Sequence, residues 1–202
     1  MSIKITTLVE NSVYGKGLQG EHGLSLLVDT GEHRLLFDTG ASDLFIRNAR
    51  ILGIDLKEVD FLVLSHGHRD HTGGLHHFLA VNDKAQVVCK RELFQLKFKD
   101  ERENGVMQPD ALDSTRFRFV DEVTELCRGV FVFPQLPVTD EEDTHFEHFF
   151  TWAEGRKQAD TFTDELALVL KQGAEVSVLS ACSHRGITNI IRAVQELSLI
   201  HI

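Results

Sequence analysis

The sequence is poor in cysteine, in long apolar runs and in repeats, and these shortages exclude several classes of protein. Its three cysteines, Cys89, Cys127 and Cys182, are odd in number and lie far apart. They favour reduced thiols in a cytoplasmic protein over a disulfide framework. No apolar run approaches transmembrane length, and the opening MSIKITTLVEN alternates like a strand and lacks the pattern of a signal peptide. We therefore expect a cytoplasmic protein that makes no contact with a membrane.

Basic residues are also scarce relative to acidic ones. There are 21 Lys and Arg against 31 Asp and Glu, which gives a formal net charge of -10. An acidic surface repels phosphate backbones, so we expect no nucleic-acid partner. A small anionic substrate remains compatible with this charge where metal ions or basic groups offset it locally. With 202 residues, 42% of them hydrophobic, the chain is expected to form one domain over residues 1–202.

Hydrophobic patterning predicts strands and helices in alternation. Period-two alternation and short apolar runs predict strands at 2–9, 24–28, 34–37, 59–65, 85–89, 165–171 and 175–181. Helices are predicted at 42–54, 73–82, 91–98 and 186–197. The pieces at 116–120 and 123–133 indicate short antiparallel strands, and the acidic stretch 134–164 has no clean period and is interpreted as a long loop, a candidate lid. The fold class is therefore α/β or α+β, with helices covering sheet faces.

The stretch LSHGHRDHTGGL, residues 64–75, follows one of the apolar strands and is rich in metal-ligating side chains. It contains His66, His68, Asp70 and His71 within six residues. On a strand-end loop, His66 and His68 can face one ion, while Asp70 and His71 face a second. Imidazole and carboxylate together suit Zn²⁺, Mn²⁺ or Fe. Two ions about 3.5–4 Å apart can activate a shared water for attack. The alternative is a polar surface loop that is rich in histidine by chance.

Two other strand ends carry side chains of the same kinds. Asp38 ends the strand in LLFDTG, where its carboxylate can orient a ligand imidazole through the second ring nitrogen. The alternative is an ordinary aspartate in a turn between strand and helix. In SACSHRG, Cys182 and His184 follow another apolar strand, and His184 can complete the ligand set of a metal. The alternative there is a segment that caps the following helix.

These motifs resemble those of the metallo-β-lactamase superfamily, whose signature is His-X-His-X-Asp-His. The residues LVEN, EHGLSLLV, LLFDTG, LVLSHGHRDHTGGL and ACSHRGI together resemble one subgroup of it. Its members are described as 7,8-dihydropterin-6-methyl-4-(β-D-ribofuranosyl)aminobenzene 5'-phosphate synthase-like proteins. The resemblance extends from about residue 3 to residue 197 and is weakest between 95 and 160.

The resemblance implies an αββα sandwich with a dinuclear site at one edge. It assigns the metal to His66, His68, Asp70, His71 and His184, makes Asp70 the catalytic residue as well, and gives Asp38 a supporting role. Relatives often have Gly-Asp, which supplies a bridging carboxylate, where this chain has Ala181-Cys182. That ligand is left open between a Cys182 thiolate and Asp164. Glu21 and His22 are either pocket residues or plain loop residues.

The resemblance also implies that this chain is truncated at its C-terminus. Relatives continue with a further strand and a histidine that binds metal, whereas this chain ends in QELSLIHI. Residues from about 197, including His201, resemble the translated remnant of a sequencing adapter. We therefore expect the second half of the sandwich to be incomplete and metal to bind weakly. An exposed sheet edge would make a homodimer possible.

The predicted function is a metal-dependent hydrolase or transferase. It would use hydroxide held by two divalent ions, zinc or else manganese or iron, on a small phosphorylated or pterin-like substrate. The alternatives are an iron-binding oxidoreductase of the same fold and an inactive metal-binding fragment. A nuclease is disfavoured by the charge, and a β-lactamase by the lack of a signal peptide.

Overall fold

The computed structural model describes residues 2–201, and the side chains of residues 2–196. The expectation that the tail from about residue 197 is non-native therefore concerns side chains outside the described residues. Among the described residues, no helix combines the length and the apolar character that a membrane span requires.

The larger sheet has six strands in the order β1-β2-β3-β4-β5-β8. Strand β1 (Lys4–Val9) pairs antiparallel with β2 (Ser25–Asp29), and β2 pairs antiparallel with β3 (Arg34–Phe37). From β3 onward the pairing is parallel, through β4 (Phe61–Val63), β5 (Gln86–Cys89) and β8 (Phe117–Phe119). The carboxyl ends of these four strands therefore meet at one edge of the sheet, where the loops after β3 and β4 begin.

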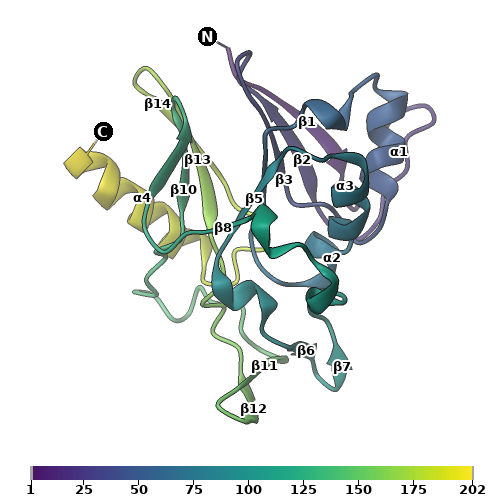
Figure 1. Ribbon diagram of the computed structural model, residues 1–202. Helices are drawn as coiled ribbons and strands as arrows, with labels where there is room; N and C mark the ends of the chain where they lie inside the picture. Colours follow the sequence, from purple (N-terminus) through teal and green to yellow (C-terminus); the bar gives the residue numbers. More distant parts are fainter. Residues whose placement is uncertain (1, 202) are drawn as a thin grey trace.

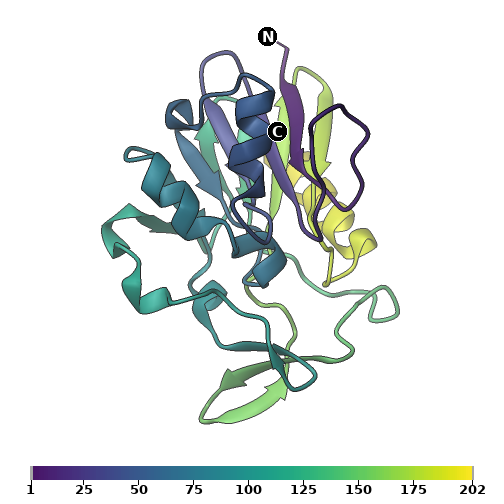
Figure 2. The ribbon, with the colours of Figure 1, turned by 90° about the vertical axis from the view of Figure 1, so that its right-hand side faces the viewer.

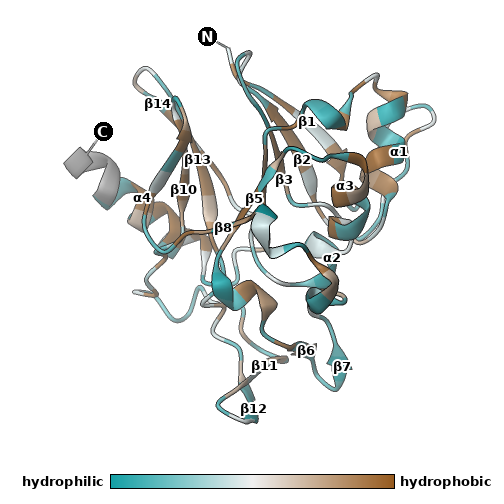
Figure 3. Cartoon of the chain, in the orientation of Figure 1, coloured by the Kyte–Doolittle hydropathy of each residue, from teal (hydrophilic) through white to brown (hydrophobic). Residues whose placement is uncertain are grey.

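The second sheet has the order β14-β13-β10-β9 and is antiparallel throughout. Its strands are β9 (Thr124–Cys127), β10 (Val130–Phe133), β13 (Ala167–Gln172) and β14 (Glu175–Leu179). Aliphatic side chains of β10 and β13, such as Val132 and Leu168, pack against Phe37 and Val63 of the larger sheet. Strands β10 and β13 carry hydrophobic residues in Figure 3, as burial between two sheets requires.

Helices cover both outer faces. Helix α1 (Leu44–Ile51) and helix α3 (Leu75–Val81) bury Phe45 and Phe78 against the larger sheet. Helix α4 (Ile187–His201) buries Ile190 and Val194 against the second sheet. Figures 1 and 2 show these layers, with α4 on one side of the two sheets and α1 and α3 on the other. The predicted αββα sandwich is confirmed. Within the described residues, its second sheet has four strands where the first has six.

A third, small sheet lies below the sandwich in Figure 1, in segments for which no sheet was predicted. Its order is β12-β11-β6-β7, with β6 (Lys97–Lys99), β7 (Arg102–Glu103), β11 (Phe149–Ala153) and β12 (Arg156–Ala159). The interpretation of 134–164 as loop is therefore wrong for β11 and β12. Strand β6 takes part of the helix predicted at 91–98, and only a 3-10 turn at Arg91–Phe94 remains of that helix. These strands are short, and each depends on a partner far away in the sequence.

One strand was assigned the wrong direction. Strand β8 was predicted as antiparallel, but it pairs in parallel with β5. The remaining short helices are α2 (Arg69–Thr72) and the 3-10 turns Leu56–Glu58, Pro109–Ala111 and Ser114–Arg116. Helix α2 lies directly in the histidine-rich stretch, so this stretch is not a simple loop.

Candidate metal centre

The histidine-rich stretch leaves β4 at the carboxyl edge of the larger sheet and is held tightly there. The backbone N–H of Thr39 donates to the carbonyl oxygen of His71 (2.8 Å), which ties the stretch to the loop after β3. A Cβ atom at Gly73 would collide with the carbonyl oxygen of Ala41. Glycine at that position therefore permits the close approach of the two loops that brings their side chains together.

Three imidazoles converge at this edge with a nitrogen left free. His66, His68 and His184 are buried, and the Nε2 atom of each has no hydrogen-bond partner. The three rings lie with their centroids 4.8–5.1 Å apart. Their ligating atoms all lie within 4.8 Å of one another. Buried polar atoms are rarely left unpaired, so three unpaired nitrogens facing each other indicate a site for a cation.

Hydrogen bonds to the other ring nitrogen define the tautomer of two of these histidines. Ser65 donates its hydroxyl proton to Asp38 (2.7 Å), so its Oγ accepts from His66 Nδ1–H (2.9 Å). His184 Nδ1–H donates to the carbonyl oxygen of His145 (3.0 Å). Both neutral rings therefore carry their proton on Nδ1 and present the lone pair of Nε2 to the cluster, which is the tautomer that a metal ligand needs.

A second group of candidate ligands adjoins the first. His71 Nε2 lies 3.1 Å from Cys182 Sγ and 3.3 Å from the Oδ2 atom of Asp70. The ligating atoms of His66, His71 and Cys182 also lie within 4.8 Å of one another. Because His66 belongs to both sets, the two groups are neighbours. The first group contains His66 and His68 and adds His184, and the second contains His71 and adds Cys182, whereas Asp70 is in neither of these two groups.

Asp38 holds His71 of this second group in place through a hydrogen bond. Its Oδ2 accepts from His71 Nδ1–H (2.7 Å), and its Oδ1 accepts from the backbone N–H of Ser65 (2.7 Å). Asp38 is fully buried and has a positive φ of 59°. The structure thus places the Asp38 carboxylate against the second ring nitrogen of His71, where a partner orients a ligand imidazole.

Burial and mutual repulsion control the protonation of the cluster. Burial, together with the neighbouring imidazoles, lowers the pKa of His66 well below its ordinary value. The same causes lower the pKa of His68 to about 2. Burial lowers the pKa of His184 to about 4. For His71, burial acts in the same direction, but the Asp38 carboxylate outweighs it and raises the pKa. The three histidines with free nitrogens are thus neutral at pH 7, as ligands must be.

Aromatic rings enclose the histidines. The Phe162 ring stacks on His184 with centroids 3.8 Å apart, and the Phe149 ring lies 4.8 Å from His68 and 4.9 Å from His184. Phe146 stacks in turn on Phe162. All three come from the stretch predicted as a loop, which therefore covers the histidine cluster. The sequence did not identify these phenylalanines as site residues, because they belong to no recognisable motif and have no regular spacing.

A buried ion network lies behind the cluster. Lys97 of β6 donates to Asp160 (2.6 Å) and to Asp164 (2.9 Å), and the second oxygen of Asp164 accepts from the backbone N–H of Gly67 (2.6 Å). Asp164 therefore holds the backbone between His66 and His68 and belongs to neither candidate ligand group. Sequence reasoning missed Lys97 entirely, since a lone lysine in a short strand resembles an exposed edge residue.

Glu21 and His22 have different positions. The Glu21 carboxylate accepts from the backbone N–H of Ala41 and of Ser42 and from the Ser42 hydroxyl, so it organises the loop that enters α1. His22 is exposed, and its Nε2 lies 3.4 Å from Asp70. Of the two, only His22 reaches the rim of the site.

Fold and site together define an αββα protein whose histidine cluster can hold metal ions. A sequence model of the metallo-beta-lactamase superfamily matches residues 18–164, which is most of the chain. The chain therefore belongs to the metallo-beta-lactamase superfamily, and the resemblance noted in its motifs is confirmed.

Relatives agree with this assignment. Two proteins of Methanocaldococcus jannaschii are each 28% identical to this chain. One is a 7,8-dihydropterin-6-methyl-4-(beta-D-ribofuranosyl)-aminobenzene-5'-phosphate synthase, matched over 99% of this chain and 74% of its own length. The other is an uncharacterized protein, matched over 97% and 75%. The crystal structure of Tm1679, described as a metal-dependent hydrolase of the beta-lactamase superfamily, is 33% identical, with a TM-score of 0.81 over 96% of this chain and 72% of that one.

Proposed function

We propose that this protein is a metal-dependent hydrolase or transferase that acts on a small phosphorylated substrate. The observation that carries the proposal is the convergence of three buried Nε2 atoms, on His66, His68 and His184, none of which has a hydrogen-bond partner. Desolvating three lone pairs without a partner is costly, and a bound cation would remove that cost. The similarity to a metal-dependent hydrolase at 33% identity supports the same conclusion.

The residues present fit a pair of divalent ions. The first would be held by His66, His68 and His184, and the second by His71 and Asp70. Neutral imidazoles combined with carboxylate favour zinc, with manganese or iron as alternatives. Ions held there would supply a nucleophile at neutral pH by lowering the pKa of water. The protein's own contribution is to hold each imidazole in the correct tautomer and to exclude bulk water with Phe149 and Phe162.

Two cations support a phosphorylated substrate. A pocket of about 390 Å³ is lined by Lys90 and Arg185, together with Thr163 and Glu165. Arg185 directly follows His184, and the Glu165 carboxylate accepts from the backbone N–H of both residues. In a chain with a net charge of -10, two cations line this pocket, and one of them follows the cluster residue His184 in the chain, which suits a phosphate group. The pterin-related synthase among the relatives handles a phosphate ester by its name.

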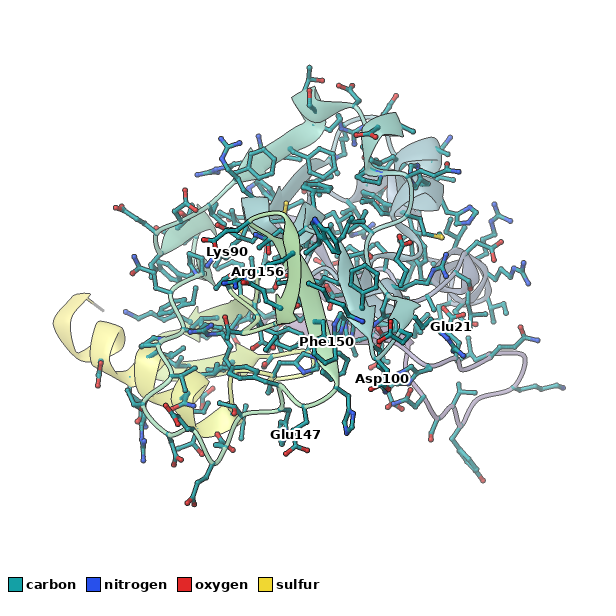
Figure 4. The ribbon with its side chains drawn as sticks, turned by 90° about the horizontal axis from the view of Figure 1, so that it is seen from below. Glu21, Lys90, Asp100, Glu147, Phe150 and Arg156 are labelled. Atoms are coloured by element: carbon teal, nitrogen blue, oxygen red, sulfur yellow. The ribbon has the colours of Figure 1, made fainter. Side chains whose placement is uncertain are left out.

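The open end of the molecule is consistent with a planar ring in the substrate. Figure 4 views this end from below, with Phe150 on β11 and Arg156 on β12 in front. Half-buried Phe149 borders His68 and His184, half-buried Phe146 stacks on Phe162, and both can offer faces on which an aromatic ring stacks. We therefore extend the proposal to a phosphorylated substrate that carries a flat heterocycle, such as a pterin.

The test combines metal content with a substrate screen. The wild type and His68→Ala, purified without added metal, would be compared by elemental analysis. We expect divalent metal in the wild type and a loss in the variant. The metal-loaded wild type would then be screened with phosphoesters, including phosphorylated pterins. We expect turnover of a phosphorylated substrate, which Arg185→Met lowers through KM. Absence of bound metal in the wild type would overturn the proposal, and iron with oxygen consumption would replace it with an oxidoreductase.

A further inference from the structure

Strand β14 lies at one end of the second sheet and, among the described residues, pairs only with β13. Val176 lies opposite Lys171 of β13 in this pairing. The backbone N–H of Lys171 donates to Gly129, on the β10 side of β13, so Lys171 and Val176 form a pair without hydrogen bonds between them. Because the two kinds of pair alternate along an antiparallel ladder, the backbone N–H and C=O groups of Val176 and Val178 face away from β13. These are the groups that a further strand would use.

Apolar side chains are exposed on both faces of this edge. Val176 shares a face of β14 with Val178, which packs against the core under α4, but the Val176 side chain is 42% exposed. Ile187, in the first turn of α4, is 48% exposed. On the face between the two sheets, a cavity of about 70 Å³ is lined by exposed Ile5 of β1 and by Ser177. An apolar edge of this kind indicates a surface that another chain covers.

The other terminal strands of the two large sheets carry features that discourage pairing with a further strand. Strand β1 has an irregularity in its register between Thr7 and Val9. Strand β8 has Arg118 at its centre, and β9 contains Glu125. Bulges and charges are the usual protection of a sheet edge. In β14 the single charge is Glu175, at the first residue of the strand, and the four residues that follow are uncharged. Of these four terminal strands, β14 is therefore the least protected.

We propose that β14 pairs with β14 of a second copy of this chain, antiparallel about a two-fold axis at Ser177. The two four-stranded sheets then form one continuous sheet. In this register Val176 lies opposite Val178 of the partner subunit, and the outward backbone groups of these two residues exchange hydrogen bonds across the axis. The sequence allowed a homodimer through an exposed sheet edge, and β14 is the edge that fits it.

Charge is compatible with this arrangement although each chain carries a net charge of -10. Glu175 lies opposite Leu179 of the partner subunit, so no like charges face each other within the strand pair. The two Glu175 positions are four residues apart along the pair, about 14 Å, which exceeds the Debye length of about 8 Å at physiological ionic strength. The net charges of the two copies still repel at long range. We therefore expect added salt to strengthen the dimer.

Sedimentation equilibrium tests the association. A strand pair buries less surface than a stable dimer needs, so the protein would be studied from about 1 µM to about 500 µM. We expect the wild type to dimerise within this range. Val176→Lys should weaken the dimer at least about 10-fold, because it removes an apolar contact and places two like charges beside the axis. Ile51→Lys, which changes an equally exposed isoleucine of α1 on the opposite side of the sandwich, is the matched control and should dimerise like the wild type.

Disulfide trapping tests the register. Two Ser177 Cα atoms would lie about 4.5 Å apart across the axis, which a disulfide can bridge. We expect Ser177→Cys to form a bridge between copies on mild oxidation. Glu175→Cys should form none, since its two Cα atoms would be about 14 Å apart. Mass spectrometry of the oxidised protein distinguishes this bridge from any bridge through the native cysteines.

A wild type that is monomeric at every concentration would overturn the proposal, as would equal association of the wild type and Val176→Lys. A bridge in Glu175→Cys without one in Ser177→Cys would overturn it too. Circular dichroism of each variant establishes that it is folded. The proposed function is unaffected by any of these results, because the histidine cluster contains no residue of β14.

Discussion

Asp38 directly follows β3 and His71 lies in α2, and the two meet through a buried 2.7 Å contact between carboxylate Oδ2 and ring Nδ1. Thirty-three residues separate them in the chain. The same carboxylate accepts from Ser65, which in turn accepts from His66. One aspartate behind the cluster therefore controls the orientation of imidazoles in both candidate ligand groups.

Replacement of Asp38 by asparagine tests this control. Asparagine tolerates the positive φ of 59° at this position, but its amide nitrogen cannot accept the proton of His71 Nδ1. We expect the second metal ion to bind about 10–100-fold more weakly, with a smaller effect on the first. Competition with a chromophoric chelator measures both affinities. Asp43→Asn, which removes a surface ion pair with Arg47, is the matched control. Equal affinities in the wild type and Asp38→Asn would contradict an orienting role.

His184 and His145 form a matched pair for testing the three-histidine group. His184 contributes its ring to the cluster, whereas His145 contributes only its backbone, which exchanges two hydrogen bonds with His184. Loss of a residue that only hydrogen-bonds to a metal ligand typically weakens metal binding by roughly 10–100-fold. His184→Ala removes a ligand itself, so we expect it to weaken binding of the first ion by more than this. His145→Ala should retain metal, since alanine keeps the same carbonyl oxygen. The prediction fails if dialysed samples of the two variants hold the same amount of metal.

Lys97 tests the ion network behind the cluster. Its side chain is 1% exposed and pairs with two buried carboxylates. We expect Lys97→Met to lower the free energy of unfolding by about 3–5 kcal/mol, because Asp160 and Asp164 are left buried without a counter-ion. Urea denaturation of metal-free protein measures this. Lys157→Met, which breaks an exposed pair with Glu101, should cost less than about 1 kcal/mol. The double variant Lys97→Met/Asp164→Asn should regain part of the lost free energy of unfolding. If it regains none, the unpaired buried charge is not the cause of the loss.

The buried carboxyl group of Glu165 is expected to make the free energy of unfolding depend on pH. Burial raises its pKa from the ordinary value of 4.5 to about 7, against the lowering effect of hydrogen bonds from the Arg185 and His184 backbone. The folded protein therefore binds the proton more tightly than the unfolded chain. This stabilising contribution is fully present below about pH 4.5 and is lost as the pH rises through about 7, with a full size on the order of 3 kcal/mol.

The comparison of the wild type with Glu165→Gln isolates that contribution, because other titrating groups act on both proteins alike. We expect the free energy of unfolding of metal-free wild type to fall relative to Glu165→Gln between pH 5 and pH 8. Urea unfolding at several pH values in the presence of a chelator measures the difference. If the free energies of unfolding of the two proteins change in parallel across this pH range, Glu165 has the same pKa in the folded and the unfolded chain.

The elements that were predicted correctly are those whose pattern is local. The strands around 24–28, 34–37 and 59–65 and the helix that begins with Leu44 carry their apolar period within a few residues. Strand β8 was assigned the wrong direction, since direction depends on its neighbour β5. Strands β11 and β12 were missed because β11 is completed by β6, about fifty residues earlier in the chain.

Within the site, the stretch from His66 to His71 and the strand ends that carry Asp38 and His184 could be predicted from the sequence. These signals are local, because ligand types crowd within a few residues after an apolar strand. Tertiary structure alone decided that His71 meets Cys182, 111 residues away, and that Asp164 holds Gly67, 97 residues away. It also decided that Phe149 and Phe162 enclose the histidines and that Lys97 is buried. These contacts form only when the three sheets pack against one another. The periodic spacing of hydrophobic residues along the sequence does not specify that packing.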